Sequence, residues 1–182
     1  MRKGILDLME AIPEVLKKFP NTKFIFAGGP PNCSGDQLKK QWLLPCCYEF
    51  TGQIHFTGWL KCEDLLPWYE SADIQIMPSR YEPFGMVLLE CMLHGLPIVA
   101  SDVGGPKDIL CDYENGLLLR PRDIQKLTKR ILEFIEKPTL RYKIGTTAFN
   151  DVREKWLWEK IRGKFKDVHQ QLLVKNMLQE AA

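Results

Sequence analysis

Two kinds of hydrophobic pattern alternate along this chain, one typical of helices and one typical of strands. Between positions 4 and 18, apolar residues recur three and four apart, which is typical of an amphipathic helix. Short apolar runs that stop at glycine, proline or polar residues indicate buried strands instead. The sequence therefore predicts strands over 23–27, 53–57, 73–77, 97–101 and 117–119. Helices are predicted over 4–18, 36–44, 63–71, 85–94 and 104–110, with long helical segments after Asp123 that end near Glu136, Phe149 and Leu178.

The alternation of strands and helices sets the expected architecture. Strand–helix–strand units place parallel strands in one sheet with helices on both faces. We therefore expect an α/β fold, a Rossmann-like parallel sheet sandwiched by helices. It forms a single domain over 1–182, in which 151–182 is a C-terminal helical extension. Ligands of such sheets bind at the carboxyl ends of the strands, so the loops after Ala27, Thr57, Met77 and Ser101 are the places to look for chemistry.

Composition narrows the class of protein. The 182 residues are 45% hydrophobic and 26% charged, which is ordinary for one packed domain. The net charge of +2 gives no reason to expect nucleic acid as a partner. No apolar run approaches the roughly 20 residues that span a bilayer, and the first residues show no signal-peptide pattern. We expect a cytoplasmic protein, with the inner face of the membrane as an additional location. Acidic residues interrupt a basic tract at 153–166, so we interpret it as the solvated face of a helix.

Cysteine and histidine positions give no sign of a metal site. The six cysteines form no C-x-x-C pair and no cluster with zinc spacing. Cys91 and Cys111 lie among apolar residues, where cysteine behaves as a small hydrophobe. We expect six free thiols in a reducing compartment. His55 falls inside a predicted strand and His94 at a predicted helix end, so we interpret both as structural.

One loop-to-helix junction, residues 78–90, offers the clearest chemistry. It follows an apolar strand, contains Gly85, and leads into a predicted helix. Gly85 lets a ligand approach the backbone closely, and the amides of Met86 and Val87 are free in the first helical turn. Free amides and the helix dipole favour an anion such as a diphosphate.

Two carboxylates bracket this predicted anion site. Glu82 precedes the helix, and Glu90 lies about 8 Å along the helix axis from its start. Such spacing suits recognition of hydroxyl groups on both sides of a phosphate. Retaining hydrolases place two carboxylates about 5–5.5 Å apart, so Glu82 is not assigned as a nucleophile. The sequence has no Asp-x-Asp motif to hold a metal, and we expect neither a metal nor another cofactor.

Several motifs occur together in the pattern of one known family. Glu82 and Glu90 match its Glu-(seven residues)-Glu motif, and Lys3-Gly4 matches its lysine–glycine pair. Further matches, which reach to about Leu173, are Met77-Pro78-Ser79, Glu82-Pro83-Phe84-Gly85-Met86-Val87, Gly95-Leu96-Pro97-Ile98-Val99-Ala100-Ser101, Gly104-Gly105, Asn115-Gly116-Leu117 and Trp158-Glu159. The chain thus resembles the C-terminal domain of the retaining glycosyltransferases of family 4, which have the GT-B fold.

The resemblance implies a role for each matching residue. Glu82 and Lys3 would be catalytic, with Glu82 on the donor sugar and Lys3 neutralising the diphosphate. Glu90 would accept hydrogen bonds from the ribose. The other substrate-binding groups would be the amides of Phe84, Gly85, Met86 and Val87 on the sugar and diphosphate, and the loop of Gly58, Trp59 and Leu60 along the nucleobase. For Trp59, stacking on the base and packing within the protein remain two alternatives.

The resemblance also implies parts that have no counterpart in this sequence. The family's half-domain opens with a central strand that carries an arginine several residues before the lysine, and Arg2 is misplaced for that role. The acceptor-holding N-terminal half is also missing. We therefore expect a gap between the strands at 23–27 and 73–77, filled by their direct pairing or by a segment from another chain. A fragment, a truncated gene product and one partner of a split enzyme all fit these departures.

The activity implied by the resemblance is transfer of a sugar, with retention, from a nucleotide-diphosphate donor such as a UDP-sugar. The acceptor would be a glycan, a lipid or a small molecule, and the partner an N-terminal GT-B domain or a second chain. Groups aimed at the leaving diphosphate would stabilise the transition state more than the ground state. Two alternatives remain open: a non-catalytic nucleotide-sugar-binding or assembly subunit that needs a partner chain, and a GT-B-like epimerase or phosphorylase. A phosphorylase needs a lysine for pyridoxal phosphate, and no lysine here has that context.

Overall fold

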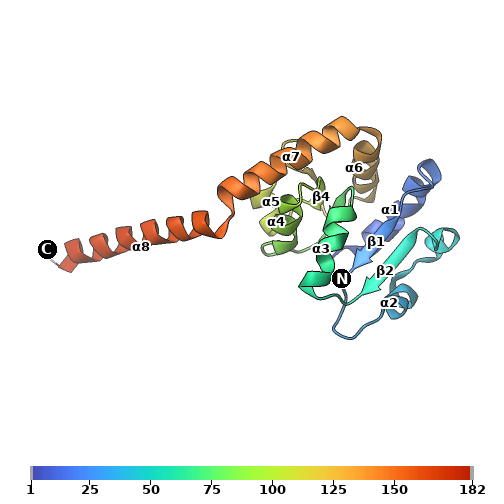
Figure 1. Ribbon diagram of the computed structural model, residues 1–182, viewed down its shortest axis with the longest axis horizontal. Helices are drawn as coiled ribbons and strands as arrows, with labels where there is room; N and C mark the ends of the chain where they lie inside the picture. Colours follow the sequence, from blue (N-terminus) through green and yellow to red (C-terminus); the bar gives the residue numbers. More distant parts are fainter. Residues whose placement is uncertain (1, 181–182) are drawn as a thin grey trace.

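Parallel strands form two separate sheets in this protein (Figure 1). The computed structural model describes residues 2–180, with side-chain burial described through residue 172. In one sheet, β1 (Phe24–Ala27) pairs with β2 (Ile54–Gly58). In the other, β4 (Ile98–Ser101) lies between β3 (Gln75–Met77) and β5 (Leu117–Leu119). All of these pairings are parallel, which confirms the predicted α/β architecture.

Helices connect the strands and flank both sheets. Contacts join α1 to α6 and to the short 3-10 helix η1, α2 to β2, and α4 to α7. The helices are α1 (Ile5–Lys18), α2 (Gly35–Trp42), η1 (Pro45–Phe50), α3 (Cys62–Ser71), α4 (Met86–Leu93), α5 (Gly104–Ile109), α6 (Ile124–Glu136), α7 (Pro138–Lys155) and α8 (Trp158–Glu180).

The first helix shows how sequence period becomes packing. Met9, Ile12 and Val15 recur three residues apart on α1, and all three are fully buried in the core. The helix starts at Gly4, whose φ of 70° lies in the left-handed region. A Cβ atom at Gly4 would lie 1.8 Å from the carbonyl oxygen of Pro78, so only glycine permits this contact. The start of α1 is thereby held against the end of β3.

A gap separates the two sheets, as expected. Among the described residues, β1 pairs only with β2, and β3 pairs only with β4. The prediction that the strands at 23–27 and 73–77 pair directly is therefore wrong. Just past the end of β3, the carbonyl of Arg2 accepts a hydrogen bond from the amide of Arg80 at 2.8 Å. The segment before α1 therefore lies against the loop that follows β3. Filling of the gap by another chain stays a prediction.

Three helical details differ from the sequence prediction. α7 continues past Phe149 to Lys155, because Val152 keeps the helical period of Ala148 and both side chains are buried. Pro67 lies inside α3 and does not break the helix; its ring is exposed. η1 was not predicted, since a 3-10 turn lacks the 3.6-residue period that identifies an α-helix.

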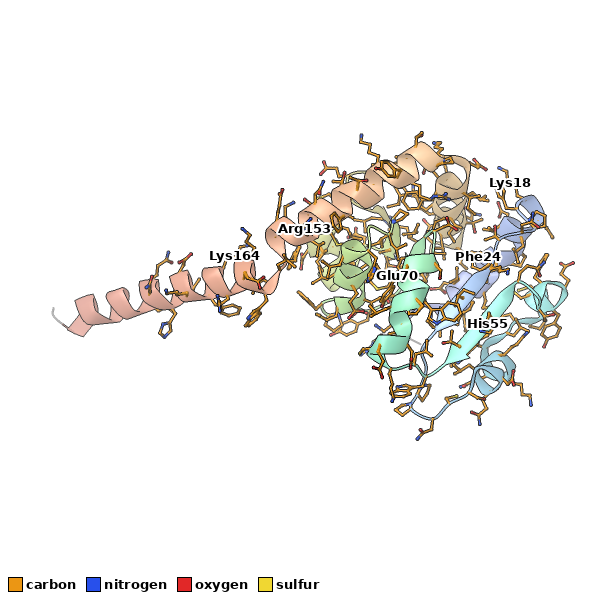
Figure 2. The ribbon with its side chains drawn as sticks, viewed as in Figure 1. Lys18, Phe24, His55, Glu70, Arg153 and Lys164 are labelled. Carbon is orange, nitrogen blue, oxygen red and sulfur yellow. The ribbon has the colours of Figure 1, made fainter. Side chains whose placement is uncertain are left out.

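The basic tract at 153–166 spans two helices rather than one helix face. Arg153 lies near the end of α7, and Lys164 lies on α8, which extends away from the rest of the chain (Figures 1 and 2). The charged side chains of the tract are exposed, which confirms that the tract is solvated.

Candidate functional site

The loop between β3 and α4 turns sharply at Gly85. Its φ of 95° and ψ of 53° lie in the left-handed region that favours glycine. α4 begins at the next residue, Met86, and no side chain of the described residues caps this helix start. The side chains of Phe84, Met86 and Val87 are 41%, 59% and 38% exposed, whereas Leu88 turns into the core. The first turn of α4 thus has no side-chain cap, which fits an anion site, and ligand binding by its amides stays a prediction.

Two further glycines hold this loop in place from the side. The amide of Gly105 donates a hydrogen bond to the carbonyl of Glu82 at 3.1 Å. A Cβ atom at Gly105 would lie 1.7 Å from the carbonyl oxygen of Phe84, and one at Gly104 would lie 2.1 Å from that of Glu82. The start of α5 thus touches the 82–84 backbone directly. This close approach explains why the sequence has two consecutive glycines after β4.

Lys3 and Glu82 form an ion pair beside the start of α4. The two residues are 79 positions apart, and both are predicted catalytic residues. The Glu82 side chain is 10% exposed, while that of Lys3 is 51% exposed. An ammonium group has three donors, so Lys3 can hold Glu82 and still donate to a bound anion.

Arg80 is a second cation at this loop that the sequence interpretation missed. Its Nε atom donates to Oδ2 of Asp7 at 3.0 Å, and its Nη2 atom donates to Oδ1 of the same carboxylate. The hydrogen bonds to Asp7 raise the pKa of Arg80. Arg2, predicted to be misplaced, lies with its guanidinium 6.0 Å from the ring centre of Tyr81. The position of Arg80 inside the 78–90 segment could have marked it as a candidate site residue. No local sequence pattern, however, predicts its contact with Asp7.

Glu90, the predicted ribose contact, lies half-buried on α4. Its Oε2 atom accepts a hydrogen bond from the hydroxyl of Tyr69, at the end of α3, at 2.8 Å. Burial and this hydrogen bond together raise the pKa of Tyr69, so its hydroxyl stays protonated and donates. Tyr69 is the second residue of the site that sequence reasoning missed.

The loop after β2 lies against the segment that precedes α2. Gly58 has a φ of 80°, and a Cβ atom there would lie 2.7 Å from the carbonyl oxygen of Cys33. The amide of Trp59 donates to that same carbonyl at 3.0 Å. Trp59 is 45% exposed and Leu60 is half-buried, so part of the indole surface is free for a planar group.

Two buried hydroxyl groups lie at the carboxyl ends of neighbouring strands. Ser79 follows β3 and Ser101 ends β4, and Met77 pairs with Ala100 in the register of these strands. Both serine side chains are at most 1% exposed, and neither hydroxyl has a hydrogen-bond partner among the described residues. Buried hydroxyls without a partner are uncommon in folded proteins. They add polar groups to the strand ends from which the 78–90 segment leaves.

A cavity of about 470 Å³ lies at the opposite end of α4. Its walls come from the end of α3, from the loops that precede β3 and β4, and from α7, and they include Tyr69, Asp73, His94, Pro97, Arg141 and Tyr142. These loops are at the amino ends of the strands. The predicted donor-site residues therefore lie on the open face around Gly85 rather than in this cavity.

The remaining candidates from the sequence have structural surroundings. His55 stacks on Trp68 with ring centres 6.0 Å apart, and His94 packs on Tyr69 at 5.4 Å. All six cysteines are free in the structure, and burial raises the pKa of Cys47 to about 12. Within residues 2–180, no three side chains that could bind a metal ion cluster together. Over the same range, every helix is too short or too polar to cross a bilayer.

Comparison with known proteins identifies the family of this chain. The family described as glycosyl transferases group 1 matches residues 1–151. An uncharacterized glycosyltransferase of Methanocaldococcus jannaschii is 34% identical over 88% of this chain and 40% of its own length. A sulfoquinovosyl transferase of Arabidopsis thaliana is 31% identical over 91% of this chain and 31% of its own length. The chain thus spans less than half the length of these curated relatives.

Solved glycosyltransferase structures superimpose on this chain. Sucrose-phosphate synthase from Thermosynechococcus elongatus superimposes with a TM-score of 0.80 at 29% identity, over 96% of this chain and 43% of that one. The C-terminal domain of a group 1 glycosyl transferase from Francisella tularensis superimposes with a TM-score of 0.75 at 29% identity, over 86% of this chain and 81% of that domain. The chain has the fold of a GT-B C-terminal domain and belongs to the glycosyl transferases group 1 family.

Proposed function

We propose that this chain is the donor-binding domain of a family 4 retaining glycosyltransferase, and that it binds a nucleotide-diphosphate sugar at the face around Gly85. One observation carries the proposal. The Lys3–Glu82 ion pair lies beside an uncapped helix start that Gly85 opens. A cation, a carboxylate and free backbone amides are therefore gathered at one point, and these groups complement a diphosphate that is joined to a sugar.

Each group around this point would bind a different part of the donor. The amides of residues 84–87 and Lys3 would hold the diphosphate, whose charge grows as the bond to the sugar breaks. Because the amides are fixed before the reaction, they stabilise that charge without reorganising. Glu82 would accept hydrogen bonds from the sugar hydroxyls, and Glu90 from the ribose. The exposed face of Trp59 would border the nucleobase. Lys3 and the helix start supply the positive field that a metal would otherwise provide, so we propose that none is needed.

Relatives support the choice of a nucleotide donor. A variant of S. aureus TarM was solved with Fondaparinux, alpha-GlcNAc-glycerol and UDP, and this chain superimposes on it with a TM-score of 0.77 at 25% identity. A mannosyltransferase of Corynebacterium glutamicum, 27% identical over 87% of this chain, is described as GDP-mannose-dependent. We propose a UDP-sugar donor as the first choice and a GDP-sugar as the second.

Transfer needs more than the donor site. A glycosyl acceptor has to reach the sugar in a closed cleft from which water is excluded. Since the chain spans less than half of its curated relatives, we propose that a partner domain or second chain supplies the acceptor side. The chain of 182 residues alone should bind a nucleotide sugar weakly and catalyse no measurable transfer. Efficient turnover without a partner would contradict this part of the proposal.

The donor site is tested by binding. A thermal-shift panel of UDP-, GDP- and ADP-sugars identifies the nucleotide, and calorimetry then compares Glu90→Gln with the unsubstituted chain. We expect Glu90→Gln to lose about 1–3 kcal/mol of binding free energy, the range for a hydrogen bond to a charged group. Glu154→Gln, on the exposed face of α7, is the matched control and should bind normally. If the Glu90→Gln variant binds UDP and GDP as tightly as the unsubstituted chain does, Glu90 does not hold the ribose.

A further inference from the structure

The contact between Tyr69 and Glu90 joins two helices at the proposed donor site. Tyr69 lies two residues before the end of α3, and Glu90 lies in the middle of α4. The hydroxyl of Tyr69 donates to Oε2 of Glu90 across 2.8 Å, and the two residues are 21 positions apart. Such a contact can serve the fold, by satisfying a buried hydroxyl, or it can serve the carboxylate, by fixing its direction.

Tyr69 is the rigid member of the pair. Its side chain packs against the cluster of buried residues that contains Leu88, Cys91 and Met92, and its ring lies 5.4 Å from that of His94. A ring held on two sides keeps its hydroxyl at one point. Glutamate has three rotatable side-chain bonds, and ordering a long side chain on binding costs affinity.

Glu90 has no second protein partner among the described residues. No lysine or arginine lies within ion-pair distance of it there, and only Oε2 accepts a hydrogen bond. A carboxylate offers about four lone-pair sites on its two oxygens. The bond to Tyr69 therefore uses one site and leaves Oε1 free to accept from a ligand.

We propose that Tyr69 is a positioning residue of the donor site, which fixes Oε2 of Glu90 so that Oε1 is presented to the ribose hydroxyls. This inference rests on the proposed function, because it takes the ribose as the ligand of Glu90. Tyr69 touches no substrate in this arrangement. It acts only through the carboxylate, and that restriction is what an experiment can test.

The experiment measures binding of UDP and of 2′,3′-dideoxy-UDP, which lacks both ribose hydroxyls, by calorimetry. Tyr69→Phe removes the hydroxyl and keeps the ring, so the packing against α4 is retained. We expect Tyr69→Phe to weaken UDP binding about fivefold to tenfold, since the ligand must then order Glu90 itself. The same change should leave the affinity for 2′,3′-dideoxy-UDP within about twofold, because no ribose hydroxyl contacts Glu90 in that complex. Tyr142→Phe, an exposed tyrosine with no contact to Glu90, is the matched control.

A double variant separates positioning from a general structural role. In the Glu90→Gln background, Tyr69→Phe should cost no further affinity for UDP, because the carboxylate that it directs is gone. A Tyr69→Phe loss of equal size for both nucleotides, or one that persists in the Glu90→Gln background, would overturn the positioning role and leave the donor site intact. If Glu90→Gln itself has no effect on UDP binding, the proposed function of Glu90 fails first, and the role of Tyr69 fails with it.

Discussion

The two sheets of this protein differ in how they are built and in what they contribute. In the three-stranded sheet, all four residues of β4 are buried, and the loop and helix that follow β3 hold Glu82, Gly85 and Glu90. In the two-stranded sheet, alternate residues of β1 face solvent, Ile25 is 40% exposed, and only the loop at 58–60 belongs to the candidate site. The half with the better-packed strands thus holds the groups that need exact placement, as expected for a site built on rigid elements.

Helix α1 joins these two halves. Asp7 and Lys3, at its start, pair with Arg80 and Glu82 from the loop after β3. At its other end, Lys18 pairs with Glu136 of α6. The middle of α1 packs on η1, which precedes β2, and on α6, which contacts β4 and β5. Because no strand pairing connects the sheets within residues 2–180, their relative position depends on this helix.

The largest effect should come from breaking the buried contact between the halves. Arg80→Ala leaves Asp7, whose side chain is 5% exposed, as a buried charge without its partner. Removing one member of a buried pair typically costs about 3–5 kcal/mol, and we expect the lower end because Arg80 itself is partly exposed. Urea unfolding measures the change, with Arg120→Ala on the surface as the matched control. A midpoint equal to that of the control would mean that α1 is held to the loop by its apolar face alone.

The next largest effect concerns the three-stranded half alone. Gly105→Ala puts a methyl group 1.7 Å from the carbonyl oxygen of Phe84, so the 82–84 backbone has to move. Overpacking of this kind costs about 1–3 kcal/mol, and nucleotide affinity should fall with it because Glu82 and the α4 amides are displaced. Gly163→Ala is the control, since it is also a helical glycine and has open space around it. We expect that variant to be slightly more stable, because alanine favours helices. Unchanged nucleotide affinity in Gly105→Ala would show that the loop is not held by α5.

Local patterns in the sequence were enough to predict the strands and the glycine turn that precedes α4. Each apolar run between glycines or prolines became a strand within two residues of its expected ends, and α4 begins directly after Gly85, within one residue of its expected start. The contacts of Arg80 with Asp7, 73 positions away, and of Tyr69 with Glu90 left no comparable trace. They depend on how α1 and α3 dock, and docking leaves no periodic signal in a single sequence. The absence of direct pairing between β1 and β3 likewise has no local signal in the sequence.

The smallest effect should come from α6, which contacts α1 and the strands β4 and β5. Glu133 accepts hydrogen bonds from Lys137 and Tyr113 at 3.0 Å and from Arg130 at 3.3 Å. Burial by itself raises the pKa of Glu133, but these hydrogen bonds outweigh it and lower the pKa below its ordinary value. A carboxylate with a lowered pKa in the folded state stabilises the protein above its unfolded pKa of about 4.3, and that stabilisation is lost as pH falls through the lower folded value.

Glu133→Gln should therefore be less stable than the unsubstituted chain at pH 7 by about 0.5 kcal/mol, the scale of partly exposed ion pairs. In urea unfolding the difference should shrink below about pH 4, where the carboxyl is protonated in both states. Glu114→Gln, an exposed glutamate before β5, should show no such pH dependence. A Glu133→Gln difference that stays constant from neutral to acidic pH would mean that the amide loses packing rather than charge, and α6 would then be held to α1, β4 and β5 by its apolar face.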